Sequence, residues 1–202
     1  GITYLAQRVE QEAEFLRSSD IWFRPVQFAN APDGCLYIVD MYREVIEHPH
    51  SFPDEIKKHL DLTSGRDRGR LYRVFQEGAT LRKPQQLSKL SSAELVDMLT
   101  HPNAWNREAA SRLLYERGDD SVVPQLRQMV RTCDAPLGRI HALFALNGLG
   151  ELDEESVIIA LQDTQPEIRE AALRLAEQFS QSNEIAAKVG ALARDDSPRV
   201  RY

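Results

Sequence analysis

The sequence predicts a mainly α protein, an α–α superhelix preceded by a small N-terminal β element of about three strands. Two observations support this prediction. Paired amphipathic helices recur with a period of about 31 residues over residues 90–202, which is typical of helical repeats that stack on one another. Within residues 19–76, segments rich in aromatic and β-branched residues alternate with turn residues, which is typical of β-strands.

The N-terminal residues 1–18 are predicted to form a helix. Leu5, Val9 and Ala13 recur at helical spacing among acids and glutamines. Such spacing gives a helix one apolar face.

The β element begins with a predicted hairpin. The segments "IWFRPVQFA" (21–29) and "CLYIVDMY" (35–42) flank the turn residues "NAPDG" (30–34). A third strand, "GRLYRVF" (69–75), follows an insertion at 43–68. Within this insertion we expect a short helix that begins with a proline, in "PDEIKKHLD".

The insertion also carries "EHPH", in which Glu47, His48 and His50 stand close together. Residues i and i+2 of an extended chain point to the same side, so the two histidines could bind a divalent metal. A catalytic zinc would need a third ligand, for which Asp40 and Asp54 are the candidates. A structured connector and part of a substrate cleft are the alternatives, and the connector is favoured over the metal site.

The run "SGRDRGR" (64–70) places Arg66, Arg68 and Arg70 at every second position. Such arginines can bind phosphate or carboxylate. The favoured interpretation is a turn whose arginines pair with nearby acids, with Asp61, Asp67 and Glu44 as the candidates.

A polar linker over residues 77–89 separates the β element from the helical repeats. Beyond it, Ser91 and Glu94 have the spacing of a capping box at a helix start. The second helix of each later pair carries an arginine in register, and these arginines lie 32, 30 and 32 residues apart: Arg107, Arg139, Arg169 and Arg201.

At these positions the segment resembles HEAT-like repeats. "DTQPEIREAA" (163–172) and "DDSPRVR" (195–201) match the HEAT pattern of Asp and Pro in the turn followed by an apolar residue and Arg. Gly138 and Asn106 depart from it at the apolar position. The resemblance implies a structural ladder between neighbouring repeats, formed by those arginines together with Asp134, Asp163 and Asp195.

The β element resembles the end of the β-propeller in a family of membrane-bound dehydrogenases of planctomycete type, which is similar to quinoprotein glucose dehydrogenases. The matching strings are "FRPV", "APDG", "LYIVDMYREVIEHP", "LDLTSGRDRGR" and "LYRV". The resemblance implies that residues 19–76 form one partial blade and that HEAT-like repeats follow it. The chain would then be a fragment of a larger protein.

This resemblance also implies a function. The chain would be a non-catalytic junction or scaffold in an extracytoplasmic, quinone-dependent sugar or alcohol dehydrogenase that is periplasmic or membrane-associated. Quinone and c-type haem would belong to the parent protein, and no cofactor to the fragment. The insertion would line a cleft of the intact propeller, with Tyr42, Arg43, Glu44, His48 and His50 nearest to it. The alternative is a stand-alone protein-binding scaffold of HEAT repeats, unrelated to dehydrogenase activity.

Charge, hydropathy and motif content limit the classes of partner and site that we expect. The net charge of −6 argues against nucleic acid, and no stretch is long and apolar enough to predict a membrane span. Cys35 and Cys133 lack metal-site spacing and are interpreted as separate thiols. No nucleophile–base order or phosphate-binding loop occurs, so no catalytic residue is predicted. We expect protein or intramolecular partners, or a dimer through the exposed edge of the blade.

Overall fold

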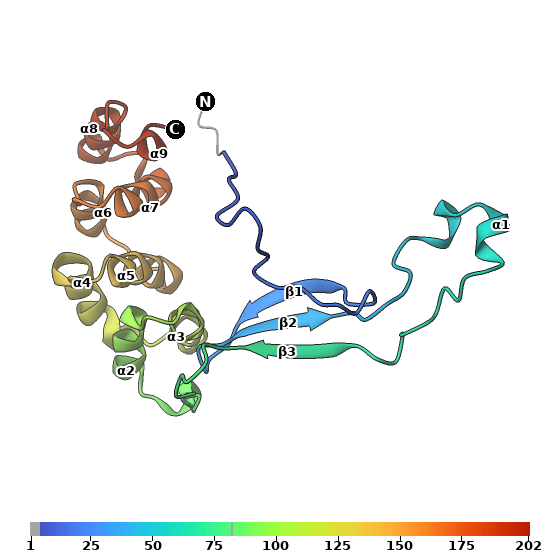
Figure 1. Ribbon diagram of the computed structural model, residues 1–202. Coiled ribbons are helices and arrows are strands. Elements are labelled where there is room, and N and C mark those ends of the chain that lie inside the picture. The colour runs from blue at the N-terminus through green and yellow to red at the C-terminus, as the bar shows by residue number, and fades with distance from the viewer. Residues whose placement is uncertain (1–4, 82) are drawn as a thin grey trace. The chain divides into compact units, whose positions relative to one another are not determined.

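The computed structural model describes residues 5–81 and 83–202. The chain divides into two compact units. Ala6–Pro84 form the first, called here the sheet unit, and the second, the helical unit, begins at Gln85. Figure 1 shows the elements of both, and each unit is described separately below.

The sheet unit contains three antiparallel strands in the order β1-β2-β3. These strands are β1 (Pro25–Asn30), β2 (Leu36–Asp40) and β3 (Arg70–Val74). The predicted hairpin and third strand are therefore confirmed. The hairpin turn closes because the amide of Ala31 donates to the carbonyl of Cys35 and that of Gly34 to Ala31, both at 3.0 Å.

One face of the sheet is organised around β2. Ile38 pairs with Phe28 on β1 and with Tyr72 on β3, and its side chain is fully buried. Asp40, two residues further on, lies on the same face and is also fully buried. The register shifts between Pro25 and Gln27, so β1 carries a bulge opposite Asp40.

The predicted N-terminal helix is wrong over residues 5–18, where the chain forms bends and no helix; residues 1–4 lie outside the described range. Val9 is 97% exposed and Phe15 is 78% exposed. These apolar side chains are therefore not covered by packing. Without such packing, a helix of this length is only marginally stable in water.

The insertion contains a 3₁₀ turn at Pro49–Ser51 and one short helix, α1 (Asp54–Lys57). Pro53 is the N-cap, whereas it was predicted as the first helical residue, and the helix ends earlier than predicted. None of its residues is buried. Without burial only local contacts such as the Lys57–Asp54 ion pair at 2.6 Å support it.

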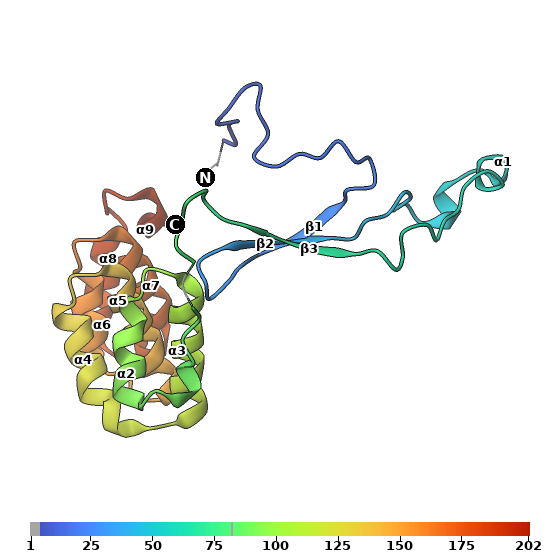
Figure 2. The same cartoon turned by 60° about the horizontal axis from the view of Figure 1, so that its bottom comes forward.

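The helical unit consists of helices that pack in pairs. α3, α5, α7 and α9 form one layer and α2, α4, α6 and α8 the other, as Figures 1 and 2 show. The fold class is thus mainly α within the described residues. The bounds are α2 (Ser92–Asp97), α3 (Ala104–Arg117), α4 (Val123–Thr132), α5 (Pro136–Leu149), α6 (Glu154–Leu161), α7 (Pro166–Ala176), α8 (Asn183–Leu192) and α9 (Pro198–Arg201).

A single hydrophobic core extends through the helical unit. Each fully buried leucine stabilises it by about 2 kcal/mol relative to an exposed one, and these leucines include Leu99, Leu114, Leu143 and Leu161. Leu87 also belongs to this core. The last residues of the predicted linker, 87–89, therefore belong to the helical unit as a 3₁₀ turn.

The capping box at the start of α2 is confirmed. Ser91 N donates to Glu94 Oε2 at 2.7 Å, and Glu94 N donates to Ser91 Oγ at 3.3 Å. Both backbone donors would otherwise lack a helical partner, so this pair fixes where the first helix begins.

Candidate functional site

A buried carboxylate holds together the end of the sheet. Asp40 Oδ1 accepts hydrogen bonds from Arg24 N at 2.8 Å and from Tyr42 N at 2.9 Å. The other oxygen, Oδ2, lies 3.8 Å from Arg70 Nη1 and makes no hydrogen bond in the described part of the chain. A buried carboxylate is costly unless it is hydrogen-bonded. Asp40 therefore fixes the backbone where β2 leaves the sheet.

Tyr42 continues this cluster in an unusual conformation. Its φ of 49° lies in the left-handed region, which is uncommon for a residue with a side chain. The guanidinium of Arg70 lies 3.5 Å above its ring centroid, and the ring of Trp22 lies 5.6 Å away. These contacts hold the strained residue in place.

Gly65 allows the loop to close against Tyr42. Its φ is 81°, and a Cβ added there would lie 2.1 Å from the carbonyl oxygen of Tyr42. No side chain fits at that distance, so the close approach of the two backbones requires glycine.

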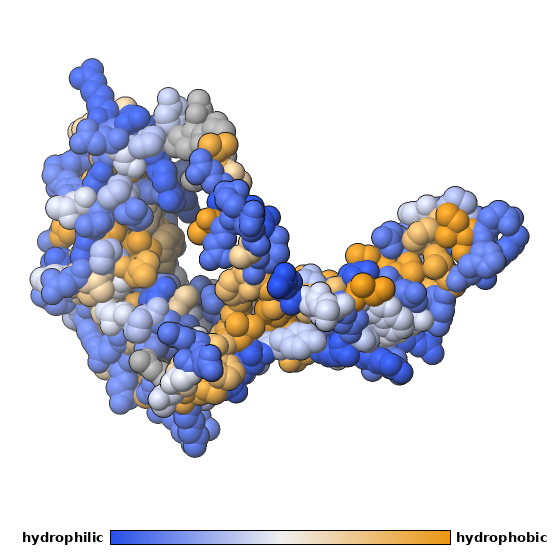
Figure 3. Space-filling view, in the orientation of Figure 1, coloured by the Kyte–Doolittle hydropathy of each residue, from blue (hydrophilic) through white to orange (hydrophobic). Residues whose placement is uncertain are grey.

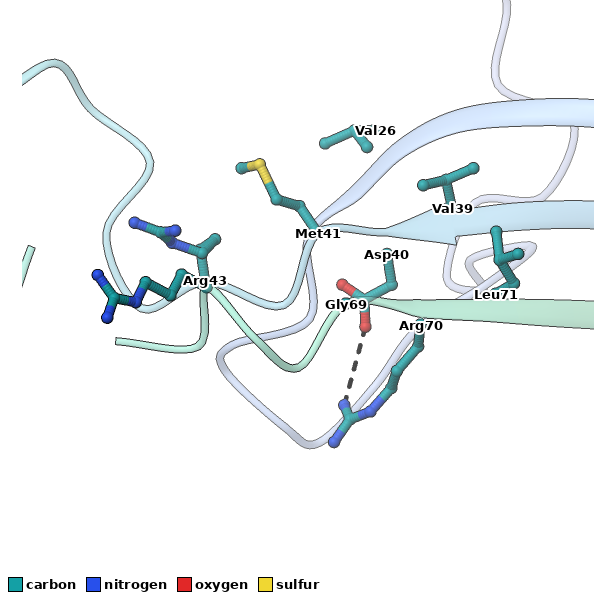
Figure 4. Close-up of a pocket in the computed structure, with 9 residues that line it drawn as sticks. Val26, Val39, Asp40, Met41, Arg43, Gly69, Arg70 and Leu71 are labelled. Carbon is teal, nitrogen blue, oxygen red and sulfur yellow. Dashed lines mark ion pairs between the residues drawn. The ribbon is translucent and has the colours of Figure 1, made fainter. Parts of the chain in front are cut away.

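A pocket of about 360 Å³ lies beside the end of β2. Its lining combines the apolar residues Val26, Val39, Met41 and Leu71 with Gly69 and the charged residues Asp40, Arg43, Arg66 and Arg70. Figure 4 shows the apolar side chains on one side of the strands, whereas the side chain of Arg70 extends to the opposite side, where it faces Asp40. Asp40 and Arg70 thus line the pocket from the side opposite its apolar side chains.

Three of the predicted cleft residues lie in this region, and they are Tyr42, described above, Arg43 and Glu44. Arg43 lines the pocket, and its Nη2 donates to the carbonyl of Leu62 at 2.7 Å. Its Nε is buried and has no hydrogen-bond partner among the described residues. Glu44 contributes its backbone carbonyl, which accepts from Arg24 Nη2 at 3.3 Å.

The arginine run agrees with the prediction only in part, since the charge of Arg66 acts on Asp61 whereas Arg70 lies near other acids. Arg70 lies 3.8 Å from both Asp40 and Asp20, and not against Asp61, Asp67 or Glu44. Its partners come from residues distant in sequence because β3 places it opposite Asp40. Asp61 instead accepts hydrogen bonds from Thr63 and Ser64, and these bonds, led by that from the Thr63 side chain, lower the pKa of its carboxyl to about 2.

His48 and His50 lie together without a third ligand. Their rings stack with centroids 5.2 Å apart, and His50 N donates to His48 Nδ1 at 3.3 Å. Glu47 Oε2 accepts from Ile46 N at 3.2 Å. Over residues 5–81 and 83–202, no group of three or more His, Cys, Asp or Glu residues could hold a metal ion. The arrangement therefore lacks the ligand set that a zinc site needs.

In the helical unit, the four arginines in register make one repeated contact. Each donates from Nη1 to the backbone carbonyl six residues earlier, in the turn before its own helix. This contact stabilises the turn by satisfying a carbonyl that lies outside helical hydrogen bonding. The arginines are Arg107, Arg139, Arg169 and Arg201.

Two of these arginines also join neighbouring turns. Arg139 Nε and Nη2 donate to Asp163 at 2.8 and 3.0 Å, and Arg169 makes the same bidentate contact with Asp195 at 2.8 and 2.7 Å. The hydrogen bond from Arg169, together with one from Ser197 N, lowers the pKa of the Asp195 carboxyl.

The pair expected between Arg107 and Asp134 does not form. Arg107 Nε donates to His141 Nε2 at 3.4 Å, and Asp134 is exposed. Because a guanidinium only donates, Nε2 must accept, so Nδ1 carries the proton toward Ser111 Oγ at 3.1 Å. Burial, and next the charge of Arg107, lowers the pKa of His141. In this tautomer the imidazole cannot take a proton from Ser111, so the two are not a nucleophile and its base.

Large apolar side chains are exposed on α3 and α5, which belong to the layer formed by α3, α5, α7 and α9. Leu137 and Phe144 on α5 are 50% and 42% exposed, and their separation of two turns places them on one face. Trp105 and Tyr115 on α3 are exposed as well, and Tyr115 lies against Gly148 of α5. We call these four residues the α3–α5 patch. In Figure 3, apolar surface is visible at the level of α5.

Cys35 is buried, Cys133 is half-buried, and both thiols are free, as predicted. No helix in the described residues has the length and apolar character needed to cross a bilayer.

Comparison with known proteins adds one match. A family model described as a domain of unknown function (DUF7133) matches residues 1–78. This range covers the strands and their insertion and stops before the helical unit. No curated protein and no solved structure matches the chain.

Proposed function

We propose that the helical unit is a solenoid of HEAT-like repeats and that the chain is a non-catalytic junction in a larger extracytoplasmic, quinone-dependent sugar or alcohol dehydrogenase. The observation that carries this proposal is the bidentate pair that recurs between neighbouring turns, Arg139 with Asp163 and Arg169 with Asp195. Paired charges of this geometry fix the orientation of successive helix pairs. A rigid helical framework is suited to holding domains or partners at a set distance.

The α3–α5 patch supports a role in binding protein. Clustered exposed apolar side chains mark interaction surfaces. The next repeat has no such cluster, because α7 carries Glu167 and Arg174 at the register positions of Leu137 and Phe144. At these two register positions α5 is therefore apolar and α7 charged, as expected if one partner or neighbouring domain contacts α5.

The sheet supports a junction with further strands. β1 is exposed along its entire length, and β1 and β3 are the edges of a three-stranded sheet. Free edges pair readily with other strands. In our proposal this sheet is a partial propeller blade, completed by the remaining blades of the parent dehydrogenase, which would also hold quinone and haem.

A second candidate is a stand-alone scaffold of HEAT repeats that binds another protein and has no part in dehydrogenase activity. The α3–α5 patch favours it equally, because the patch fits a separate partner as well as a neighbouring domain. The two candidates differ in what covers the patch.

Cysteine labelling tests the proposal. Leu137→Cys and, as a matched control at the same register position on α7, Glu167→Cys are made in a Cys133→Ser background. Maleimide reaction rates are compared in this chain and in the longer protein that the resemblance implies. We expect position 137 to react several-fold more slowly in the longer protein and position 167 to be unchanged. Equal rates at position 137 in both proteins would contradict the junction. Protection that appears only with a separate protein would favour the stand-alone scaffold.

A further inference from the structure

The pocket beside β2 has a polar end and an apolar wall, and we propose that it binds a small organic carboxylate. The site lies within the sheet unit, and the inference does not depend on the function proposed for the helices. The cations of its lining are Arg43, Arg66 and Arg70, its one acid is Asp40, and its wall consists of Val26, Val39, Met41 and Leu71.

Two of these arginines, Arg43 and Arg66, have unused capacity to donate hydrogen bonds. Arg43 is held in place by the carbonyl of Leu62 at 2.7 Å, while its Nε is buried without a partner. Leaving a buried charged donor unpaired is costly, so a ligand oxygen at this position would be stabilising. Arg66 forms no ion pair or side-chain hydrogen bond within the described residues. Its charge acts on Asp61, but that carboxylate is already hydrogen-bonded to Thr63 and Ser64.

Asp40 does not neutralise these cations. Although it contributes to the lining, its carboxylate accepts from Arg24 N and Tyr42 N and faces Arg70. Figure 4 shows this carboxylate turned toward Arg70 and away from the apolar side chains. The lining therefore carries a net positive charge, with three guanidiniums against the one carboxylate of Asp40.

The apolar wall indicates that the ligand carries an apolar body beside its carboxylate. Leu71 is 71% exposed and Val26 is 54% exposed, and covering them would be favourable in proportion to the apolar area removed from water. A volume of about 360 Å³ is at the small end of ligand pockets. The planar fork of a guanidinium matches a carboxylate. The pocket thus fits a carboxylate on an apolar body of one or two rings, and an ion without such a body would leave the wall uncovered.

Calorimetric titration of the whole chain tests the inference with three probes. 2-Naphthoate carries both the anion and the apolar body, acetate carries only the anion, and 2-naphthylmethanol carries only the body. We expect 2-naphthoate to bind with a Kd on the order of 1 mM, as suits a ligand of this size. The other two probes should bind at least about tenfold more weakly.

Variants then locate the site. Arg66→Gln should weaken 2-naphthoate binding about tenfold. It should affect folding little, because within the described residues the Arg66 side chain makes no hydrogen bond or ion pair, and the bond from Arg66 N to the carbonyl of Thr63 is a backbone one. Arg43→Gln should do the same, with its fold checked by circular dichroism. Arg68→Gln is the matched control, since Arg68 stands in the same loop, is exposed and does not line the pocket. Unchanged binding by Arg66→Gln, equal loss with Arg68→Gln, or equal affinity for naphthoate and naphthylmethanol would each overturn the proposal.

Discussion

Breaking the pair between Arg139 and Asp163 should reveal how strongly neighbouring helix pairs are coupled. The Arg139 and Asp163 side chains are only 13% and 10% exposed, and two hydrogen bonds of 2.8 and 3.0 Å join them. Removing one partner of a buried pair typically costs 3–5 kcal/mol. Because some water reaches both groups here, we expect Asp163→Ala and Arg139→Met each to lower the free energy of unfolding by about 3 kcal/mol.

The double variant separates the energy of the interaction between Arg139 and Asp163 from the effects of each substitution on other contacts. In a double-mutant cycle the coupling energy should be about 2 kcal/mol, since charged hydrogen bonds contribute about 1.5–3 kcal/mol. The assay is urea unfolding followed by far-ultraviolet circular dichroism.

A natural control lies on the other layer of helices. Arg131 and Glu155 also pair between neighbouring helices, at 2.7 Å, but their side chains are 36% and 67% exposed. Exposed pairs contribute about 0.2–1 kcal/mol, so the cycle of Arg131→Met with Glu155→Ala should give well under half the coupling of the buried pair. Equal coupling in the two cycles would refute the reasoning that burial makes the Arg139–Asp163 pair strong.

Three further predictions follow from single positions. Because the pKa of His141 is lowered in the folded protein, the unfolded chain binds more protons than the folded one as the pH falls below about 6.5. The free energy of unfolding should therefore decrease from pH 7 to pH 5. In urea titrations, His141→Gln should remove the part of this pH dependence that His141 causes. Gly138→Ala should destabilise by about 1–3 kcal/mol in the same assay, because its Cβ would lie 2.9 Å from two neighbouring side chains. Gly190→Ala, in open space, should stabilise by about 0.5–1 kcal/mol, and the reverse order would contradict the packing described. Gly65→Ala should abolish cooperative thermal unfolding of the sheet unit. Gly78 has a similar φ, but a Cβ there would have nothing within 4 Å, so Gly78→Ala should lower the free energy of unfolding by only about 1 kcal/mol. Equal effects of the two substitutions would show that the contact with Tyr42 is unimportant.

Much of the fold could be predicted because its signals are local. The alternation around Ile38, the turn at Gly34 and the capping box of Ser91 with Glu94 each act within a few residues, so the sequence alone indicates them. The N-terminal helix could not be judged in this way. Its apolar spacing was correct for a helix, but stability depends on a packing partner, and a single sequence does not reveal one.

The candidate site depends on contacts that are distant in sequence. Arg70 meets Asp40 only because β3 pairs with β2, and the arginine run itself gave no sign of this. His141 takes the place that the repeat pattern assigned to Asp134. The sequence departs from the repeat pattern at Gly138 in the same helix, but this departure does not point to His141. Arg43 was predicted from the sequence as a cleft residue. The apolar wall beside it could not be predicted, because it forms only when the strands pair into a sheet.

The central claim, that this chain is a non-catalytic junction of a quinone-dependent dehydrogenase, is tested most directly by dye reduction. Turnover of sugars and alcohols with an artificial electron acceptor is measured for this chain and for the longer protein that the resemblance implies, together with the quinone content of each. We expect activity and bound quinone in the longer protein and neither in this chain. Turnover by this chain alone, or a longer protein with neither quinone nor activity, would contradict the account.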